Sequence, residues 1–441
     1  MWHRPSRWTL AAFAFAVVAG FIAWLILGRG EPTHRLPDGR EFSIVAVTYG
    51  TNHILEGGPP WARLIARLGS RSMASRFGYK SSGVYPSALP SVMVWTRWFS
   101  GNSNSAPQYA SVADARGTET EPVAFLSTET VTPKRNGTYL AWRFENYPRL
   151  QKEFTLRFYE HDLFRIRARR EGEVLVRNPV LAANVSFTAP APPTKATNGT
   201  LETTLIGLRC GGPPPRRPLT AKNAIAPWAA AEFEFREKGQ PTTNWIIKRI
   251  EAFGVNGNYF TGDRLAMEPE EGTRVAYFTG AFWQDEMDWK LVAEAVPTRN
   301  FPAESLLTLR LPTKAFLHDL FVTNLQVESY GLRNSRLSVA PDLTGSRGKA
   351  TPDRHVAFVR LNYAPAALDL YVDIASAKDD QGRELLISRS LASRSWSCEA
   401  DLELLQTAEF VDLTFAIHRS RRLEFRVRPE IVSTNVPVNK R

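Results

Sequence analysis

The segment Glu153–Arg169, EFTLRFYEHDLFRIRAR, shows the pattern that decides the fold. Apolar side chains occupy every second position from Phe154 to Phe158, and polar side chains lie between them. The alternation starts again at Phe164 and continues to Ala168, with arginines in between. A period of two is typical of a strand with one buried face and one solvated face. The segment therefore predicts two antiparallel strands joined by a turn.

The same period of two recurs along the chain, most clearly in residues 232–236, 368–374 and 423–428. Turn sequences lie between such runs, for example Asn198-Gly199 and Asp379–Gly382. The sequence has neither a βαβ pattern nor a glycine-rich phosphate loop. We therefore predict a mainly β fold built from tandem antiparallel β-sandwich units.

The composition is that of a folded chain with several units. At roughly 150 residues per domain, the 441 residues suggest about three domains. Two cysteines exclude a disulfide-rich scaffold and a Cys-based zinc module. The formal net charge of +11 favours anionic partners, such as phospholipid headgroups or acidic glycans. No nucleic-acid-binding motif accompanies the charge, so no nucleic-acid partner is expected.

Residues 8–27 form an uncharged apolar stretch that predicts a single N-terminal transmembrane helix. It has 20 residues, of which only Thr9 is clearly polar, and a helix of that length crosses a hydrocarbon core of ~30 Å. This length favours an uncleaved signal anchor, with cleavage near Gly28–Gly30 as the alternative. Arg4 and Arg7 precede the stretch and keep the N-terminus cytoplasmic. We expect a single-pass protein with its bulk extracytoplasmic, in the periplasm if the host is Gram-negative.

Clusters of proline and glycine divide the chain into units. We expect residues 1–30 to form the cytoplasmic tip and the anchor, and residues 31–190 to form a first β-rich unit. A proline-rich linker, Ala189–Thr194, leads to a second sandwich over residues 197–312. A third sandwich is expected over residues 313–441.

Residues 178–295 carry a loose resemblance to a group of known proteins. Its motifs are Asn178-Pro179 before a proline-rich segment, then Gly199–Leu205, Glu251–Asn258 and Trp283–Leu291. In this order the chain resembles uncharacterised bacterial membrane-anchored β-sandwich proteins. The resemblance implies a β-sandwich fold and a place outside the cytoplasm, and it implies no activity.

Residues 59–77 interrupt the β pattern and predict an amphipathic helix. Its apolar residues are Trp61, Leu64, Ile65 and Leu68, and its arginines are Arg63, Arg67 and Arg71. Two interpretations fit this spacing. The helix packs against the first sandwich with its arginines in solvent, or it lies on anionic lipid with Trp61 and the arginines at the membrane interface.

Asp285, Glu286 and Asp288 form the densest acidic cluster, between Trp283 and Trp289. Two carboxylates beside aromatic rings suit glycoside hydrolysis. The other interpretation, which the sequence favours, is a polar turn that leads into a strand. These acids are therefore the candidate catalytic residues of the alternative function, a carbohydrate-active enzyme.

Arginines gather on the polar side of the strands expected in the first unit, namely Arg143, Arg157, Arg165, Arg167 and Arg169. Neighbouring strands lie ~4.8 Å apart, so these side chains would form one patch for an anionic ligand if they shared a sheet face. The alternative is a solvated face on which the arginines pair with nearby glutamates.

The sequence contains no recognised catalytic motif: it lacks a Gly-x-Ser-x-Gly elbow, a His-Glu-x-x-His helix and a Walker loop. Its seven histidines are scattered, so we predict neither a metal site nor a cofactor. Cys210 and Cys398 lie in different expected units, which favours two separate buried thiols over a bridge. We expect a non-catalytic scaffold or binding protein of the cell envelope, with a protein, an anionic lipid or an anionic glycan as its partner.

Overall fold

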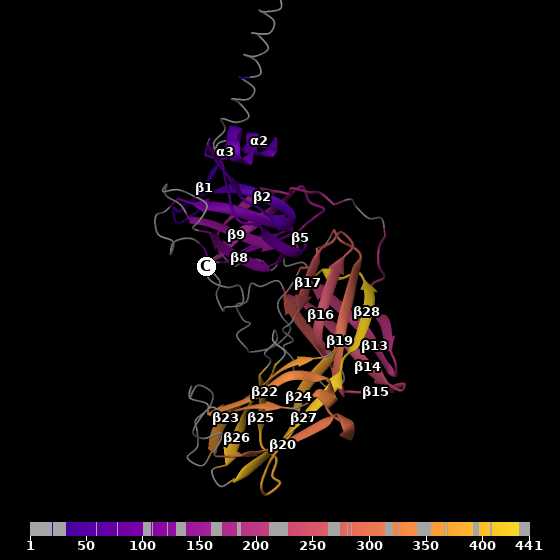
Figure 1. The fold of residues 1–441 in the computed structure, drawn as a ribbon. Helices are drawn as coiled ribbons and strands as arrows, with labels where there is room; N and C mark the ends of the chain where they lie inside the picture. The colour runs from indigo at the N-terminus through magenta and orange to yellow at the C-terminus, as the bar shows by residue number, and fades with distance from the viewer. Residues whose placement is uncertain are drawn as a thin grey trace, which may run out of the picture.

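The structure is a computed structural model, and it describes Gly20 and residues 32–431. Gaps within that range lie at residues 59, 77, 100–106, 108, 121, 129–137, 160–169, 183–186, 211–227, 263–273, 280, 284, 314–320, 326, 342–353, 366, 368, 391–396 and 406–407. The described chain is mainly β, and its sheets pack in pairs as sandwiches (Figure 1). No helix in this part is long and apolar enough to cross a membrane. The predicted span over residues 8–27 lies outside the described residues, apart from Gly20.

The first unit is a sandwich of two antiparallel sheets. One sheet has the order β1 (Thr33–Arg35), β2 (Glu41–His53), β5 (Tyr85–Trp98), β9 (Thr138–Phe144) and β8 (Ala124–Thr128). The other has the order β11 (Arg170–Arg177), β10 (Glu153–Tyr159), β6 (Tyr109–Ala113) and β7 (Glu119–Thr120). The predicted alternation from Phe154 to Phe158 is confirmed, because its apolar residues are buried. The Phe158 ring packs against Phe42 and Trp98 of the facing sheet, with centroids 5.1 Å and 5.3 Å away.

Two short helices cap the first unit between β3 (Glu56–Gly57) and β4 (Lys80–Ser81). They are α2 (Pro60–Arg67) and α3 (Arg71–Arg76), so the prediction of one helix over residues 59–77 is corrected to two. Gly69, with φ of 108°, ends the first helix in a left-handed conformation that glycine adopts without strain. Ser70 then starts the second helix, and its hydroxyl accepts a 3.3 Å hydrogen bond from the backbone of Met73.

The second unit is also a sandwich. One sheet runs β12 (Thr194–Asn198), β13 (Leu201–Cys210), β14 (Trp228–Glu237) and β15 (Gln240–Pro241), with β18 (Arg274–Thr279) beside β14 and β29 (Glu430–Ile431) beside β13. The other runs β17 (Tyr259–Gly262), β16 (Trp245–Gly254), β19 (Trp289–Pro297) and β28 (Arg421–Val427). The predicted turn at Asn198-Gly199 joins β12 to β13. Phe233 and Phe425 pack between the two sheets, with ring centroids 5.8 Å apart.

The third unit has a hydrophobic core of its own. One sheet runs β20 (Leu306–Pro312), β27 (Phe410–Arg419) and β24 (Leu370–Asp379). The other runs β21 (Phe321–Leu325), β22 (Leu332–Pro341), β23 (Arg354–Pro365), β26 (Ser397–Leu405) and β25 (Ile387–Ser390). Leu337, Val359, Leu413 and Phe415 are among its fully buried side chains. The predicted turn at Asp379–Gly382 follows β24, with Gly382 at φ of 73°.

The predicted boundary between residues 197–312 and residues 313–441 differs from the structure. β20 pairs with β27 and so belongs to the third unit, whereas β28 pairs with β19 and returns the chain to the second. A period of two identifies β28 as a strand, but it does not specify the sheet that the strand joins. The second unit is therefore closed by a segment more than 120 residues beyond β19.

The first two units form one body. A single cluster of buried apolar side chains runs through both of them, while the third unit has a separate cluster. Buried polar groups reinforce this joint: the Asn146 side chain donates a 2.8 Å hydrogen bond to the carbonyl of Ala281. The Arg149 guanidinium and the Tyr147 amide both donate to Oδ1 of Asn258, at 2.9 Å and 3.0 Å. The second and third units do not share a hydrophobic core, and a cleft opens between them.

Candidate functional site

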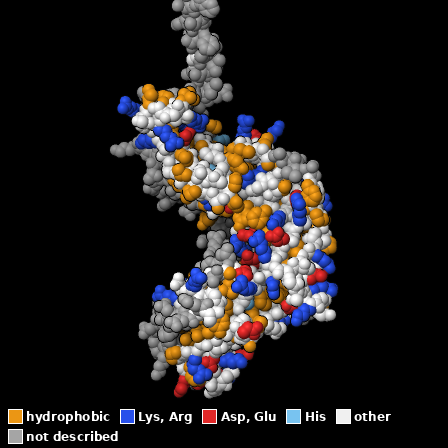
Figure 2. All heavy atoms as spheres, turned by 45° about the vertical axis from the view of Figure 1, so that its right-hand side comes forward, with side chains coloured by type: hydrophobic (Ala, Val, Ile, Leu, Met, Phe, Trp, Pro, Cys, Tyr) orange, Lys and Arg blue, Asp and Glu red, His pale blue; other side chains and the backbone are white. Residues whose placement is uncertain are grey.

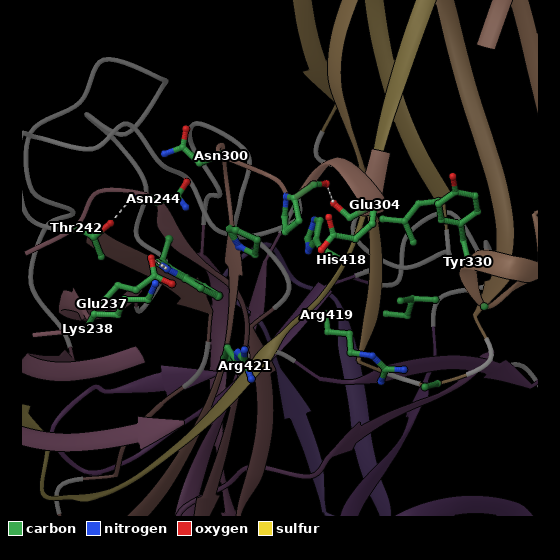
Figure 3. A pocket seen from close by; sticks show the side chains of 18 of the residues that line it. Glu237, Lys238, Thr242, Asn244, Asn300, Glu304, Tyr330, His418, Arg419 and Arg421 are labelled. Atoms are coloured by element: carbon green, nitrogen blue, oxygen red, sulfur yellow. Dashed lines mark hydrogen bonds between the residues drawn. The ribbon is translucent and has the colours of Figure 1, made fainter. Parts of the chain in front are cut away.

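The cleft lies between the second and third units, beside the two places where the chain passes from one to the other (Figure 3). Its volume is about 1110 Å³. Residues 298–305 form the first crossing, from β19 to β20, and Ser420 alone forms the second, from β27 to β28. Because both crossings border the cleft, side chains from both units line it.

The wall on the second unit is built by a tight turn and an asparagine. Lys238 and Gly239 connect β14 to β15 with φ of 51° and 80°, which is the geometry of a two-residue hairpin turn. Asn244 holds the first crossing through three hydrogen bonds, one of them from the Thr298 hydroxyl to its carbonyl at 3.2 Å. Its side-chain oxygen accepts from the Arg299 amide at 2.9 Å, and its carbonyl accepts from the Thr298 amide at 2.7 Å.

The wall on the third unit is built around His418. The residue is 8% exposed, and its Nε2 lies 3.0 Å from Oδ2 of Asp373. Phe301, from the first crossing, stacks on it with centroids 5.3 Å apart. Among the described residues, Nδ1 of His418 is buried without a hydrogen-bond partner. Across the same junction, the Tyr371 hydroxyl donates to Glu294 of the second unit.

The charged side chains of the cleft are Glu237, Lys238, Glu304, Arg419 and Arg421. Arg419 forms an ion pair with Asp369 at 2.8 Å. Within the described chain, the exposed side chains of Lys238 and Arg421 make no ion pair, so both cations remain available to a ligand. Polar groups from both units surround them, including Thr242, Asn244, Asn300, Ser305 and Tyr330. Glu237 and Glu304 place two carboxylates on the same walls, so the set can bind an anion at Lys238 or Arg421 and can donate to or accept from many hydroxyl groups.

The three predicted catalytic acids lie at the joint between the first and second units, away from the cleft. Asp285 is exposed and accepts a 2.9 Å hydrogen bond from Gln151. Glu286 is buried, and the Asn258 side chain donates to its Oε1. Burial raises the pKa of the Glu286 carboxyl to about 8. Asp288 is buried and holds the Arg426 guanidinium through both of its oxygens. The acids are thus engaged in contacts within the fold.

The predicted arginine patch is not assembled by the two members that the structure describes. Arg143 lies on β9, where its guanidinium donates a 2.8 Å hydrogen bond to the carbonyl of Pro86. Arg157 lies on β10 in the opposite sheet and pairs with Glu119 and Glu173, each at 3.2 Å. Side chains on different sheets of a sandwich do not share a face. The other members, Arg165, Arg167 and Arg169, lie outside the described residues.

The predicted membrane-interface residues divide between the two helices. Arg63 and Arg67 lie on α2, and Arg71 is the first residue of α3. Trp61 also lies on α2, but its side chain is outside the described part. Of the predicted apolar face, Ile65 is partly buried beside Ala62 and Ala66, whereas Leu64 and Leu68 are exposed. Their exposure disagrees with the interpretation in which this face packs against the sandwich.

One polar arrangement in the first unit was not predicted. Nε2 of His53 lies 2.8 Å from the Ser91 hydroxyl, and its Nδ1 lies 2.9 Å from the Thr48 hydroxyl. A serine beside a histidine resembles a nucleophile with its base. His53 and Ser91 are both fully buried, however, so this pair satisfies core polar groups and meets no substrate. Cys210 and Cys398 are two separate buried thiols, as expected.

The described residues contain no group of three His, Cys, Asp or Glu side chains that could hold a metal ion. No family model matches this chain, and no curated protein shows significant similarity to it. The cleft, with polar and charged side chains of both units on its walls, is the candidate ligand site.

Proposed function

We propose that the chain is a non-catalytic, membrane-anchored binding protein of the cell envelope, whose ligand is an acidic glycan held in the cleft between the second and third units. The single observation that supports binding is the cleft itself, with Lys238 and Arg421 uncommitted on its walls. The uncharged stretch over residues 8–27 supports anchorage, and Arg4 and Arg7 favour an extracytoplasmic location for the sandwiches.

The chemistry of the walls favours a glycan among anionic ligands. Amide and hydroxyl groups such as Asn244, Asn300 and Thr242 match sugar hydroxyls, and the two cations match uronic acid carboxylates. The volume of about 1110 Å³ exceeds the 300–1,000 Å³ that is typical for a small ligand. An oligosaccharide of several units suits such a cleft.

A binding role is preferred to catalysis because the candidate acids do not meet a shared substrate position. Asp285 is engaged by Gln151, Asp288 is neutralised by Arg426, and Glu286 is enclosed in the joint. A glycosidase needs two carboxyl groups that face one glycosidic bond across an open cleft. The alternative function is therefore not favoured by these three residues.

Titration calorimetry on the full chain in lipid nanodiscs tests the proposal. The probe is an oligogalacturonate, and a neutral maltooligosaccharide of equal length is the comparison. We expect only the acidic probe to bind. Lys238→Gln and Arg421→Gln should each weaken binding about tenfold, because a hydrogen bond to a charged group contributes about 1.5 kcal/mol.

Arg116→Gln is the matched control, since Arg116 is an exposed arginine of the first unit. It should leave affinity unchanged. Equal binding of both probes, no binding of oligogalacturonate, or equal weakening by Arg116→Gln would contradict the proposal.

A further inference from the structure

We propose that the two helices α2 and α3, residues 60–76 and here called the helical cap, dock on the anionic surface of the membrane in which the chain is anchored. The inference rests on the membrane anchorage of the proposed function, and it is independent of the glycan cleft. It assigns a lipid-binding surface to a part of the molecule that lies at the opposite end from the third unit (Figure 1).

The cap presents three large apolar side chains outward. Leu64, Leu68 and Met73 are 52%, 80% and 52% exposed. On its inner side Ala62, Ala66 and Ala74 pack together with Tyr79, and Ile65 packs against them partly buried. Helices that pack on a sandwich ordinarily bury their leucines and expose their polar residues. The reversed arrangement fits a helix pair whose apolar side enters a lipid interface.

Basic residues surround this apolar side. Residues 54–81 contain Arg63, Arg67, Arg71, Arg76 and Lys80 against one acid, Glu56, for a formal charge of +4. Arg67 pairs with Glu56 at 3.1 Å. In the described structure the other four cations form no ion pair. In Figure 2 apolar side chains cover the tip of the cap and Lys or Arg side chains lie around them. This charge complements anionic headgroups.

The direction of the chain places the cap beside the membrane. β1 is antiparallel to β2, with Thr33 opposite Ser43 and Arg35 opposite Glu41. The start of β1 therefore points in the same direction as the end of β2. β2 ends at His53, shortly before the cap. Five residues separate the apolar stretch 8–27 from Thr33. At about 3.5 Å per residue they hold the start of the first unit within roughly 20 Å of the bilayer.

The experiment uses the full chain in nanodiscs with a fluorophore at Met73→Cys, and brominated lipids as the quencher. The discs contain either phosphatidylglycerol with phosphatidylcholine or phosphatidylcholine alone. Cys210 and Cys398 are buried, so the introduced thiol is the accessible one among the described residues. We expect quenching in anionic discs at low salt and its release at high salt, because salt screens exposed charges within about 10 Å.

Two further variants serve as a control for the label position and as a test of the charge. A label at Leu386→Cys, an exposed leucine of the third unit, should stay unquenched. Replacing Arg63, Arg67 and Arg71 together by Gln should lower the ratio of docked to undocked cap by roughly 100-fold. Equal quenching in neutral and anionic discs, or an unchanged ratio in the triple variant, would overturn the proposal.

Co-elution of the chain with the discs distinguishes a failure of cap docking from a failure of membrane anchorage. A chain that co-elutes but keeps the Met73→Cys label unquenched refutes cap docking alone, and it leaves open a protein partner as the occupant of the apolar side. A chain that does not co-elute refutes membrane anchorage and cap docking together. Neither result bears on oligogalacturonate binding by the cleft.

Discussion

Replacing Glu286 by glutamine is expected to make the joint between the first and second units less sensitive to a rise in pH between 4.5 and about 8. Glu286 is 2% exposed, and its Oε2 is buried without a hydrogen-bond partner among the described residues. Burial, as the largest effect, raises the pKa of its carboxyl from an ordinary 4.5 to about 8. The folded protein therefore holds Glu286 protonated at neutral pH, and glutamine is isosteric with that form.

The direction of the change in stability with pH follows from how many protons the folded and unfolded chains bind. Below pH 4.5 the carboxyl is protonated in both the folded and the unfolded chain, so its contribution to stability is complete. Between pH 4.5 and about 8 the unfolded chain ionises while the folded chain does not, and stability falls as the pH rises. The slope is about 1.4 kcal/mol per pH unit, so the loss between pH 5.5 and pH 7.5 is about 3 kcal/mol from this group alone.

Urea unfolding of the full chain in nanodiscs at pH 5.5 and at pH 7.5 measures this difference. The parent should lose about 3 kcal/mol more than Glu286→Gln over that range. Glu234→Gln changes an exposed glutamate of the same unit and should keep the parent profile. Parallel pH profiles for the parent and Glu286→Gln would refute the assignment of a buried, protonated carboxyl to the joint.

Five other substitutions probe the architecture. Gly254→Ala would bring its Cβ into collision with Oε2 of Glu286 and should destabilise the joint by about 1–3 kcal/mol. Gly207→Ala is the control, because its Cβ would meet nothing closer than 3.7 Å. It should change the free energy of unfolding in urea by about 0.5 kcal/mol at most. Leu413→Ala should lower the free energy of unfolding of the third unit alone, by about 2–5 kcal/mol. Phe158→Ala should lower only that of the first two units. A shift of both unfolding transitions by either variant would contradict two separate cores. Burial lowers the pKa of His53, so acidification through the ordinary pKa of about 6.5 should destabilise the first unit. His53→Gln should flatten that dependence in acid titrations followed by Trp fluorescence.

The strands were predictable because their signal is local. The alternation at Phe154–Phe158 and at Leu423–Val427 depends on which face of each strand is buried, and a period of two records that directly. The pairing of β28 with β19 was not predictable, because both sheets of a sandwich accept the same alternation. The boundary at residues 312 and 313 failed for this reason.

The helical cap shows how packing can reverse a periodic pattern. Leu64 and Leu68 have the spacing of a buried face, yet alanines occupy the contact between the helices. Two short helices approach closely only where side chains are small, and Gly69 allows the tight turn between them. A hydrophobic pattern identifies the apolar positions, but it does not say whether protein or lipid covers them.

The candidate sites depended on contacts that no local pattern contains. The burial of Glu286 arises from Asn258 and from the first unit, which lie far from it along the chain. Lys238, Asn300 and Arg421 meet at the cleft only because the chain crosses twice between the second and third units. The positive charge favours an anionic partner, which stays a prediction, and it does not locate the surface that would bind one.

Hydrogen exchange of the full chain with and without oligogalacturonate tests the central claim most directly. If the cleft holds an acidic glycan, backbone amides should gain protection at residues 237–245, 298–305 and 417–421, which border it on both units. The sheets of the first unit should exchange as before. Protection confined to the first unit, or no change at the two crossings when binding is saturated, would contradict the account.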